Sequence, residues 1–346
     1  MPPESKNVPI QQNFRKPLEF LPRKYDVVYE NVFLHIAGHI SAAYGLYLCF
    51  TVAKWQTIAL AFVWYHLGKI GIICGAHRLW SHRCYKAKMP LHIILMICNC
   101  IGFENTAINW VRNHRMHHKH SDTDGDPHNS NRGAFFSHIG WLCVRKHPET
   151  RNCKVDMSDI YSNPVLVFQK RYKYPLVGFL CYGLPTFIPM YFWGETLVTA
   201  WHVNILRYFL SMNAVFLVNS LAHLYGNKPY DISICPRQSP FVSLLTIGEG
   251  FHNYHHTFPW DYRAAELGNN YLNVGKWVID FFAMIGWAYD LKTVPDETIK
   301  RRMKRTGDGT NCWGWGDKDM TREDRDIAKI IYPESISKEE RDIIAM

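Results

Sequence analysis

Residues 110–120 read WVRNHRMHHKH, and residues 248–256 read GEGFHNYHH. Both segments carry the pattern H-x-x-H-H, formed by His114, His117 and His118 in the first and by His252, His255 and His256 in the second. On a helix, positions i, i+3 and i+4 share one face, so each segment is expected to point three imidazole rings in one direction. Two such faces turned towards each other would form a cage of nitrogen ligands.

A third cluster lies in GAHRLWSHR, residues 75–83, where His77 and His82 are five positions apart. At 3.6 residues per turn this spacing corresponds to roughly 140° around an ideal helix. The pair therefore predicts a distorted helix or a helix end, and Gly75 is expected to mark the irregularity. The three clusters hold more imidazole than one metal ion can use, which predicts a site for two ions.

Histidines outside these clusters are expected to do other work. A solvated helix face is the alternative interpretation of a single H-x-x-H-H pattern, but two copies and a third pair favour metal binding. The polar loop around the cluster at residues 114–118 holds four histidines that are expected to form hydrogen bonds rather than bind metal, namely His120, His128, His138 and His147. Five more stand singly in apolar stretches as expected packing residues: His35, His39, His66, His92 and His202.

The apolar residues, 47% of the chain, are gathered into long runs. Runs at 33–53, 57–75, 175–193 and 204–223 can each cross a hydrocarbon core of about 30 Å as a helix. The sequence thus predicts an all-α membrane protein with four transmembrane helices. Its expected parts are an N-terminal segment (1–32), the membrane domain (33–293) and a charged, solvated tail (294–346). Residues 91–103 are too short to span, and residues 271–289 suit an amphipathic interfacial helix.

An even number of crossings places all three clusters on one side of the membrane, together with both termini. Basic residues crowd the cluster-bearing segments, which favours a helical cap on the cytosolic side. The scattered cysteines are typical of reduced thiols in such a location. A net charge of +9 suits an anionic membrane surface or a phosphorylated ligand, whereas a multispanning chain gives nucleic acid binding no support.

The ligand set narrows the chemistry. Structural zinc takes four ligands and catalytic zinc three, so eight or nine histidines without thiolates exceed both. Imidazole also suits iron, and two irons with four or five histidines each would leave room for oxygen. Near a membrane face this indicates oxygen-dependent attack on a lipid chain. Two rivals are a diiron membrane hydroxylase and a non-enzymatic metal transporter, although the transporter should place its ligands within the spans.

Several long motifs closely resemble the membrane-bound acyl-CoA desaturases, the stearoyl-CoA desaturase family. The resemblance runs from about residue 25 to residue 309, and residues 305–320 (RTGDGTNCWGWGDKDM) look like the insect branch, which includes enzymes of moth sex-pheromone synthesis. Besides the three clusters, the matching motifs are FFSHIGWL (135–142), VRKHP (144–148), YFWGET (191–196) and LVNSLAHLYGNKPYD (217–231).

The resemblance implies a diiron site with nine histidine ligands. One iron would be held by His77, His82, His114, His118 and His255, and the other by His117, His223, His252 and His256. Asn219 would approach the second iron through a water. His223 stands alone in its motif, so cluster counting does not find it.

Substrate contacts also transfer by resemblance. Positions that bind the acyl-CoA are matched by Asn31, Asn105, Arg112, Arg145 and Lys146. Two further substrate positions depart from the family pattern, because Asn113 replaces the usual Asp and Phe216 replaces a Trp of vertebrate members. Tyr65 and Lys69 of the second span are candidates for lining the acyl tunnel. A packed aromatic and a snorkelling or internally paired lysine are the alternatives.

The implied activity is insertion of a double bond into a saturated or monounsaturated fatty acyl-CoA, at position 9 or 11, with O₂ and two electrons. A fatty acyl conjugase or acetylenase is the alternative within the family. The resemblance also implies residence in the endoplasmic reticulum membrane. No haem-binding segment follows the cluster at residues 252–256, so cytochrome b5 is expected to be a separate electron donor.

Overall fold

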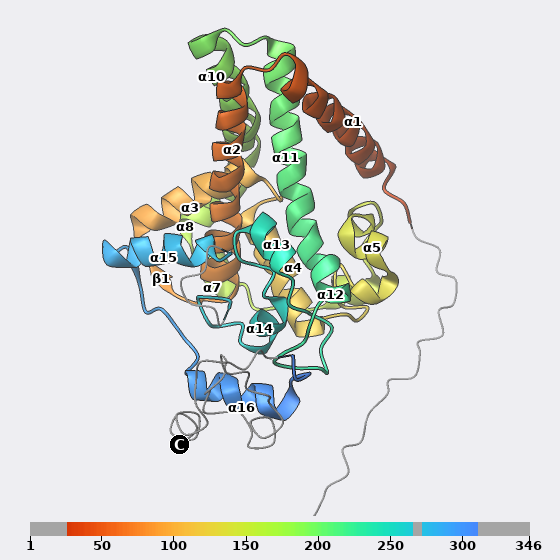
Figure 1. Cartoon of the computed structure of the whole chain (residues 1–346), viewed down its shortest axis with the longest axis vertical. Coiled ribbons are helices and arrows are strands. Elements are labelled where there is room, and N and C mark those ends of the chain that lie inside the picture. The colour runs from red at the N-terminus through yellow and green to blue at the C-terminus, as the bar shows by residue number, and fades with distance from the viewer. Residues whose placement is uncertain (1–25, 266–271, 311–346) are drawn as a thin grey trace, which may run out of the picture.

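The computed structural model describes residues 26–265 and 272–310, and nearly all of their regular secondary structure is helical (Figure 1). Four helical stretches are long and apolar enough to cross a membrane: Tyr29–Thr51, Trp55–Ser81, Lys173–Trp193 and Leu197–Leu224. They confirm the predicted all-α fold with four spans. Most of the N-terminal segment and the tail beyond residue 310, on which we also made predictions, lie outside the described residues.

The spans are built from α1 (Tyr29–Thr51), α2 (Trp55–Ile70) with the π-helix η1 (Gly71–Ser81), α9 (Lys173–Val177) with the π-helix η4 (Gly178–Gly183) and α10 (Leu184–Trp193), and α11 (Leu197–Asn219) with α12 (Leu221–Leu224). The rest forms a cap of α3 (Met89–Gly102), α4 (Ala107–His120), η2 (Ser130–Arg132), α5 (Ala134–His138), η3 (Gly140–Leu142), α6 (Pro148–Asn152), α7 (Ser158–Tyr161), α8 (Pro164–Arg171), α13 (Pro240–Thr246), α14 (His252–Thr257), α15 (Val274–Met284) and α16 (Asp296–Thr306). One antiparallel pair, β1 (Lys86–Ala87) and β2 (Ala288–Tyr289), ties its ends together.

Helix α11 is the central helix of the membrane bundle, and α1, α2 and α10 pack around it (Figure 1). The two short interhelical connections meet at the end of the bundle away from the cap. There the Glu195 carboxylate accepts hydrogen bonds from the backbone N–H of Lys54 (2.9 Å) and from the Thr57 hydroxyl (2.7 Å). These bonds fix the ends of the spans, because a buried carboxylate needs partners.

The second span is longer than predicted. It continues past residue 75 to Ser81, because η1 follows α2 without a break. The predicted distortion around His77 and His82 is a π-helix, in which the His82 N–H donates to the His77 carbonyl five residues earlier (3.1 Å). The fourth span likewise begins at Leu197, seven residues earlier than expected, where the Thr196 side chain caps α11.

The irregularity begins at Gly71, not at the predicted Gly75. A side chain at Gly71 would place its Cβ 2.1 Å from the backbone nitrogen of Asn99. The absence of a side chain therefore lets η1 lie directly against α3, while Gly75 sits one turn further inside the π-helix.

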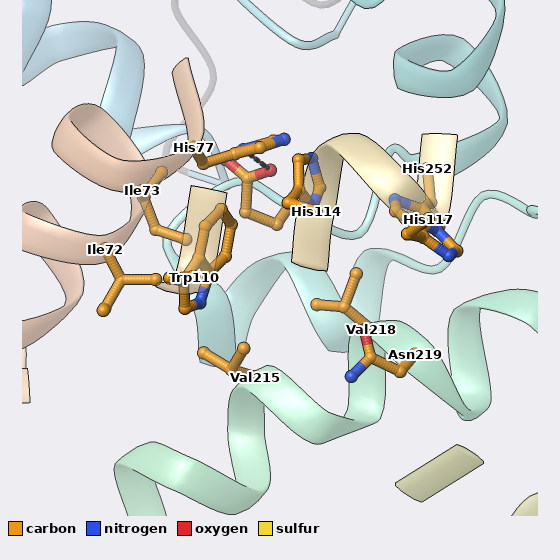
Figure 2. Close-up of a pocket in the computed structure, with 11 residues that line it drawn as sticks. Ile72, Ile73, His77, Trp110, His114, His117, Val215, Val218, Asn219 and His252 are labelled. Atoms are coloured by element: carbon orange, nitrogen blue, oxygen red, sulfur yellow. Dashed lines mark ion pairs between the residues drawn. The ribbon is translucent and has the colours of Figure 1, made fainter. Parts of the chain in front are cut away.

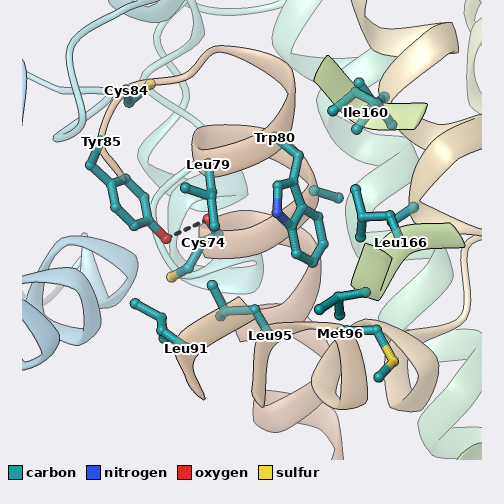
Figure 3. Packing of buried hydrophobic residues seen from close by; sticks show 14 of the residues in the cluster. Cys74, Leu79, Trp80, Cys84, Tyr85, Leu91, Leu95, Met96, Ile160 and Leu166 are labelled. Carbon is teal, nitrogen blue, oxygen red and sulfur yellow. Dashed lines mark hydrogen bonds between the residues drawn. The ribbon is translucent and has the colours of Figure 1, made fainter. Parts of the chain in front are cut away.

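A buried apolar cluster holds η1 in place (Figure 3). Trp80 of η1 and Leu91 and Leu95 of α3 are at most 3% exposed. The Tyr85 hydroxyl donates to the Cys74 carbonyl at 2.8 Å and closes the chain back over the helix. Helix α3, the short apolar segment predicted at 91–103, is bent by 84° relative to α4. The packing thus carries the second span directly into the cap.

The C-terminal part of the described chain returns to the cap. Helix α15 buries Gly275 and Ile279 and exposes Phe281 and Met284, in keeping with the predicted amphipathic segment. The predicted solvated tail begins later than expected, because Ile299 of α16 is 1% exposed and packs in a cluster with Tyr230, Tyr254, Phe258 and Val294. The charged residues around Ile299 made this buried position hard to predict from the sequence.

Replacement of Gly71 by alanine should destabilise the fold. The added Cβ would meet the α3 backbone, and such overpacking typically costs about 1–3 kcal/mol. Gly178→Ala is a matched control, because Gly178 opens the other π-helix and its Cβ would meet nothing within 4 Å. Thermal unfolding of the detergent-solubilised variants should show a lower midpoint for Gly71→Ala alone. Equal midpoints would contradict this role for the close contact.

Candidate metal centre

Nine histidines converge in two groups at the junction of the bundle and the cap. The ligand-capable atoms within each group all lie within 4.8 Å of one another. The first group is His77, His82, His114, His118 and His255, and the second is His117, His223, His252 and His256. Both groups contain the same histidines that the resemblance implied, including His223, which stands alone in the sequence.

Each H-x-x-H-H segment serves both groups, which differs from our expectation of three rings in one direction. On α4, His114 and His118 join the first group while His117 joins the second. On α14, His252 and His256 join the second group while His255 joins the first. The i, i+4 pair and the i+3 ring diverge enough around the helix to serve two neighbouring positions, so the helices straddle the two groups.

The ring nitrogens approach one another at the distance expected of ligands around a cation. In the first group, His77 Nε2 lies 3.0 Å from His255 Nε2, and His82 Nε2 lies 2.7 Å from His114 Nε2. In the second group, His252 Nε2 lies 3.0 Å from His223 Nε2. Metal–nitrogen bonds of about 2.0–2.1 Å separate adjacent ligands by about 3 Å, so the spacing fits a metal at each centre.

Buried carboxylates set the ring orientation on the far side of three of these histidines. Glu249 accepts from His77 Nδ1 at 2.7 Å, and Asp126 accepts from His117 Nδ1 at 2.8 Å. Asp122 lies 3.2 Å from His223 Nδ1. A proton held at Nδ1 leaves the lone pair on Nε2, and these lone pairs face the middle of each group.

The electrostatics favour neutral rings at six of the nine histidines and favour ionised carboxylates. Burial alone would lower the pKa of His117, but Asp126 and Asp122 together raise it above its ordinary value. Burial and neighbouring imidazoles lower the pKa values of His252, His255 and His256 well below the ordinary range. Burial alone would raise the pKa of Glu249, but the neighbouring His77 and the Arg78 guanidinium bring it down to about 2. Neutral imidazole is the form that binds metal, so the site is prepared for cations.

Asp126 is tuned in the same way. Burial would raise its pKa, yet His117, His128 and the backbone N–H of Asp122 bring it down to about 2. Arg78, which is fully buried, clamps Glu249 with its Nη2 at 2.8 Å and also donates to the Tyr262 carbonyl. The residues present therefore fit a pair of metal ions: nitrogen donors face inwards and anions compensate the charge from outside.

An apolar pocket opens beside the two groups (Figure 2). Ile72 and Ile73 of η1 and Val215 and Val218 of α11 form its walls, together with Trp110. His77, His114, His117 and His252 reach the same pocket, and so does Asn219 at the end of α11. A hydrocarbon segment in this pocket would lie next to both groups.

The predicted substrate residues lie in four parts of the chain, namely the start of α1, residues 105–113, residues 145–146 and α11. Asn31 at the start of α1 donates to the Leu142 carbonyl at 2.7 Å. Asn113 of α4 accepts from Lys146 at 2.5 Å, which joins α4 to the segment that carries Arg145. Three other predicted positions take no part in this hydrogen bond. Arg112 is exposed on α4, and Asn105 precedes α4 and accepts a hydrogen bond from Asn109 (3.0 Å). Phe216 is buried beside Trp141. An anionic group could reach Arg112, Arg145 and Lys146 from solvent.

The two tunnel candidates do not line the pocket of Figure 2. The Tyr65 hydroxyl donates to the Leu245 carbonyl at 2.7 Å, and the Lys69 ammonium donates to the Ser211 carbonyl at 2.5 Å. Lys69 is fully buried and lies 5.3 Å from the centre of the Tyr65 ring. Lys69 is thus paired within the protein, which was the alternative to a role in lining the tunnel.

Sequence reasoning missed the three carboxylates. Their one signal was position: Asp122 and Asp126 follow His117 within nine residues, and Glu249 precedes His252 by three. Three of the four loop histidines, His128, His138 and His147, form hydrogen bonds or ion pairs, as predicted. His138 lies 3.0 Å from the Ser220 hydroxyl and His147 caps α6, so neither belongs to the two histidine groups. His128 lies 3.4 Å from Asp126, and these two residues form a further candidate metal-binding group with His117 of the second group.

Fold and site together define a membrane protein in which two histidine groups that could hold metal ions lie beside an apolar pocket. The family model for the fatty acid desaturases matches residues 53–277 of the chain. The acyl-CoA Delta(11) desaturase of Trichoplusia ni is 58% identical over 90% of each chain, and that of Choristoneura rosaceana is 61% identical over 85% of this chain and 88% of its own. The (11Z)-hexadec-11-enoyl-CoA conjugase of Bombyx mori is 58% identical over 84% and 88%, respectively. The chain belongs to the fatty acid desaturase family.

Asp126→Asn should weaken metal binding at the second group. The neutral amide cannot compensate the charge behind His117, and loss of such a partner typically costs about 10–100-fold in metal affinity. Asp124→Asn is the control, because that carboxylate pairs with Arg132 at a partly exposed position. Metal analysis of the purified protein should show a reduced metal content for Asp126→Asn alone. Full retention of metal by Asp126→Asn after dialysis against a chelator would contradict the assignment.

Proposed function

We propose that the chain is an oxygen-dependent acyl-CoA desaturase, which inserts a double bond into a saturated or monounsaturated fatty acyl-CoA. The observation that carries the proposal is the pair of histidine groups lining one apolar pocket. The names of the relatives support acyl-CoA as the substrate class. A metal transporter is disfavoured because it should hold its ligands within the membrane spans. Here most of the histidines lie in the cap, beside the pocket.

The reaction requires a source of electrons. Removal of one hydrogen from each of two neighbouring methylenes, coupled to reduction of O₂ to two waters, takes up two electrons and two protons. We propose that His77, His82, His114, His118 and His255 hold one iron, and that His117, His223, His252 and His256 hold the other, with Asn219 acting through a water. Two irons held there would supply the oxygen activation.

The chain's own residues would position the substrate. Ile72, Ile73, Val215 and Trp110 exclude water and confine the acyl chain next to the irons. Such confinement selects the bond, because a reaction between two fixed partners depends steeply on their alignment. The phosphates of the CoA would bind Arg112, Arg145 and Lys146, with Asn31, Asn105, Asn113 and Phe216 completing the contacts.

Position 11 is favoured over position 9 for the new bond, because two of the similar moth relatives carry Delta(11) in their names. Conjugase activity is the second candidate, supported by the Bombyx mori relative. Both activities would suit pheromone fatty acid synthesis in an insect. A diiron hydroxylase would use a similar centre and differs in its product.

We place the protein in the endoplasmic reticulum membrane with the cap and both termini in the cytosol, where the basic residues of the cap would lie. Cytochrome b5, as a separate protein, is the proposed electron donor. The four spans and the exposed apolar side chains of α1, α2 and α10 suit direct contact with membrane lipid.

Expression in yeast that lacks its own acyl-CoA desaturase tests the reaction. Mass spectrometry of derivatised fatty esters should reveal new monounsaturated chains with the double bond at position 11. Conjugated dienes after feeding of a monounsaturated acid would establish the second candidate. Hydroxylated chains, or no product from a chain that holds iron and receives an added electron donor, would contradict the proposal.

Single alanine substitutions of His114, His117, His252 or His256 should abolish product formation in the same strain and reduce bound iron. Each removes one nitrogen donor from a group of four or five. His202→Ala is the control, since His202 bonds to Ser41 on α1 away from both groups. Full turnover by any of the four variants would remove that residue from the site.

A further inference from the structure

A second, open cleft reaches the first histidine group from the surface of the cap. It lies between the end of η1, the exposed side of α4 and residues 154–156, and encloses about 380 Å³. Its lining includes His82, Arg83, Arg115, Lys119, Lys154 and Asp156. His82 is therefore a histidine of the first group that faces solvent through this cleft.

The cleft carries an excess of positive charge. Arg83 and Arg115 both bind Asp159 at 2.8 Å, and Arg83 lies 3.7 Å from Asp156. Two arginines and two aspartates thus balance one another. The lysines are additional positive charges at the rim.

Lys119 and Lys154 remain uncompensated. The Lys119 ammonium donates to the backbone carbonyl of Lys154 at 3.0 Å, and both side chains are exposed. Within residues 26–265 and 272–310 neither ammonium is paired with a carboxylate. Two unneutralised cations side by side favour an anionic partner.

The cleft and the apolar pocket reach the first group by different routes. The pocket is lined by His77 and His114, whereas the cleft is lined by His82, and the two share no lining residue. His82 Nε2 and His114 Nε2 are nevertheless 2.7 Å apart. A partner in the cleft would therefore approach the metal centre without obstructing the acyl chain.

We propose that this basic cleft is the docking site of the electron donor, a one-electron carrier protein with an acidic face, and that His82 lies on the electron's route to the first iron. The inference rests on the proposed desaturase function, which requires two electrons per double bond. Redox proteins dock through small, charged, short-lived interfaces, and a shallow charged cleft over a metal ligand suits such an encounter. The lysines act on the association rate, since charges at an interface rim attract the partner over a distance.

Replacing basic residues by glutamate, in the cleft or elsewhere, tests whether the donor docks at this cleft or at another part of the surface. The Lys119→Glu/Lys154→Glu double variant changes the cleft, and Lys304→Glu/Arg305→Glu makes the same change in net charge on exposed positions of α16. Stopped-flow absorbance would follow oxidation of reduced cytochrome b5 by the full-length enzyme in nanodiscs with stearoyl-CoA and air. In parallel, enzyme reduced by dithionite without air would be mixed with oxygenated buffer and stearoyl-CoA, and the unsaturated product counted.

The cleft variant should oxidise cytochrome b5 at least about tenfold more slowly at low ionic strength and lose most of its salt dependence. Its dithionite-driven product and the α16 variant should match the unmodified enzyme. Unchanged cytochrome b5 oxidation, or an equal loss in the α16 variant, would overturn the docking site. A raised KM for stearoyl-CoA with unchanged donor oxidation would assign the cleft to the CoA phosphates instead. No product from dithionite-reduced unmodified enzyme would overturn the desaturase function itself.

Discussion

Nitrogen lone pairs that face one another at about 3 Å are the constraint on which the rest of this structure depends. Protons fixed on the Nδ1 atoms of His77 and His117 by Glu249 and Asp126 leave the opposite nitrogens as bare acceptors. Two bare acceptors repel at such distances unless a cation or a proton lies between them. Two cations resolve this repulsion for all nine rings, which is why we regard the protein as assembled around two metal ions.

The fold's irregular features serve the same constraint. A regular α-helix would turn His77 and His82 apart, whereas the π-helix brings their ring centres to 4.9 Å. Gly71 permits that π-helix to lie on α3, and the buried Arg78 links it through Glu249 to the chain entering α14. The second span is thus continuous with the candidate metal centre, so an acyl chain bound among the membrane helices can end at the two histidine groups.

The extent to which the sequence predicted the fold varied with the physical signal. Long apolar runs predicted the four spans, because crossing a membrane imposes length and composition alike. The ends of the spans were less predictable. Residues 75–83, GAHRLWSHR, are not apolar enough to indicate that the second span continues into them as far as Ser81. The buried side of α16 was hidden because its one deeply buried residue, Ile299, is surrounded by charges.

The candidate site shows the same division. Histidine spacing indicated metal, but the division of each H-x-x-H-H between two groups needs the relative placement of α4 and α14. His223 has no neighbouring ligand in the sequence, and the resemblance alone pointed to it. The carboxylates behind the rings and the cleft beside His82 arise from segments far apart in the chain, as with His82 and Lys154. Such contacts appear only when the chain is folded.

The most direct test of this account is an anomalous difference map collected at the iron absorption edge from crystals of the purified, iron-loaded protein. We predict two peaks, one inside the group that contains His77 and one inside the group that contains His117. A single peak, or peaks at the zinc edge instead, would contradict the diiron centre and with it the proposed oxygen chemistry.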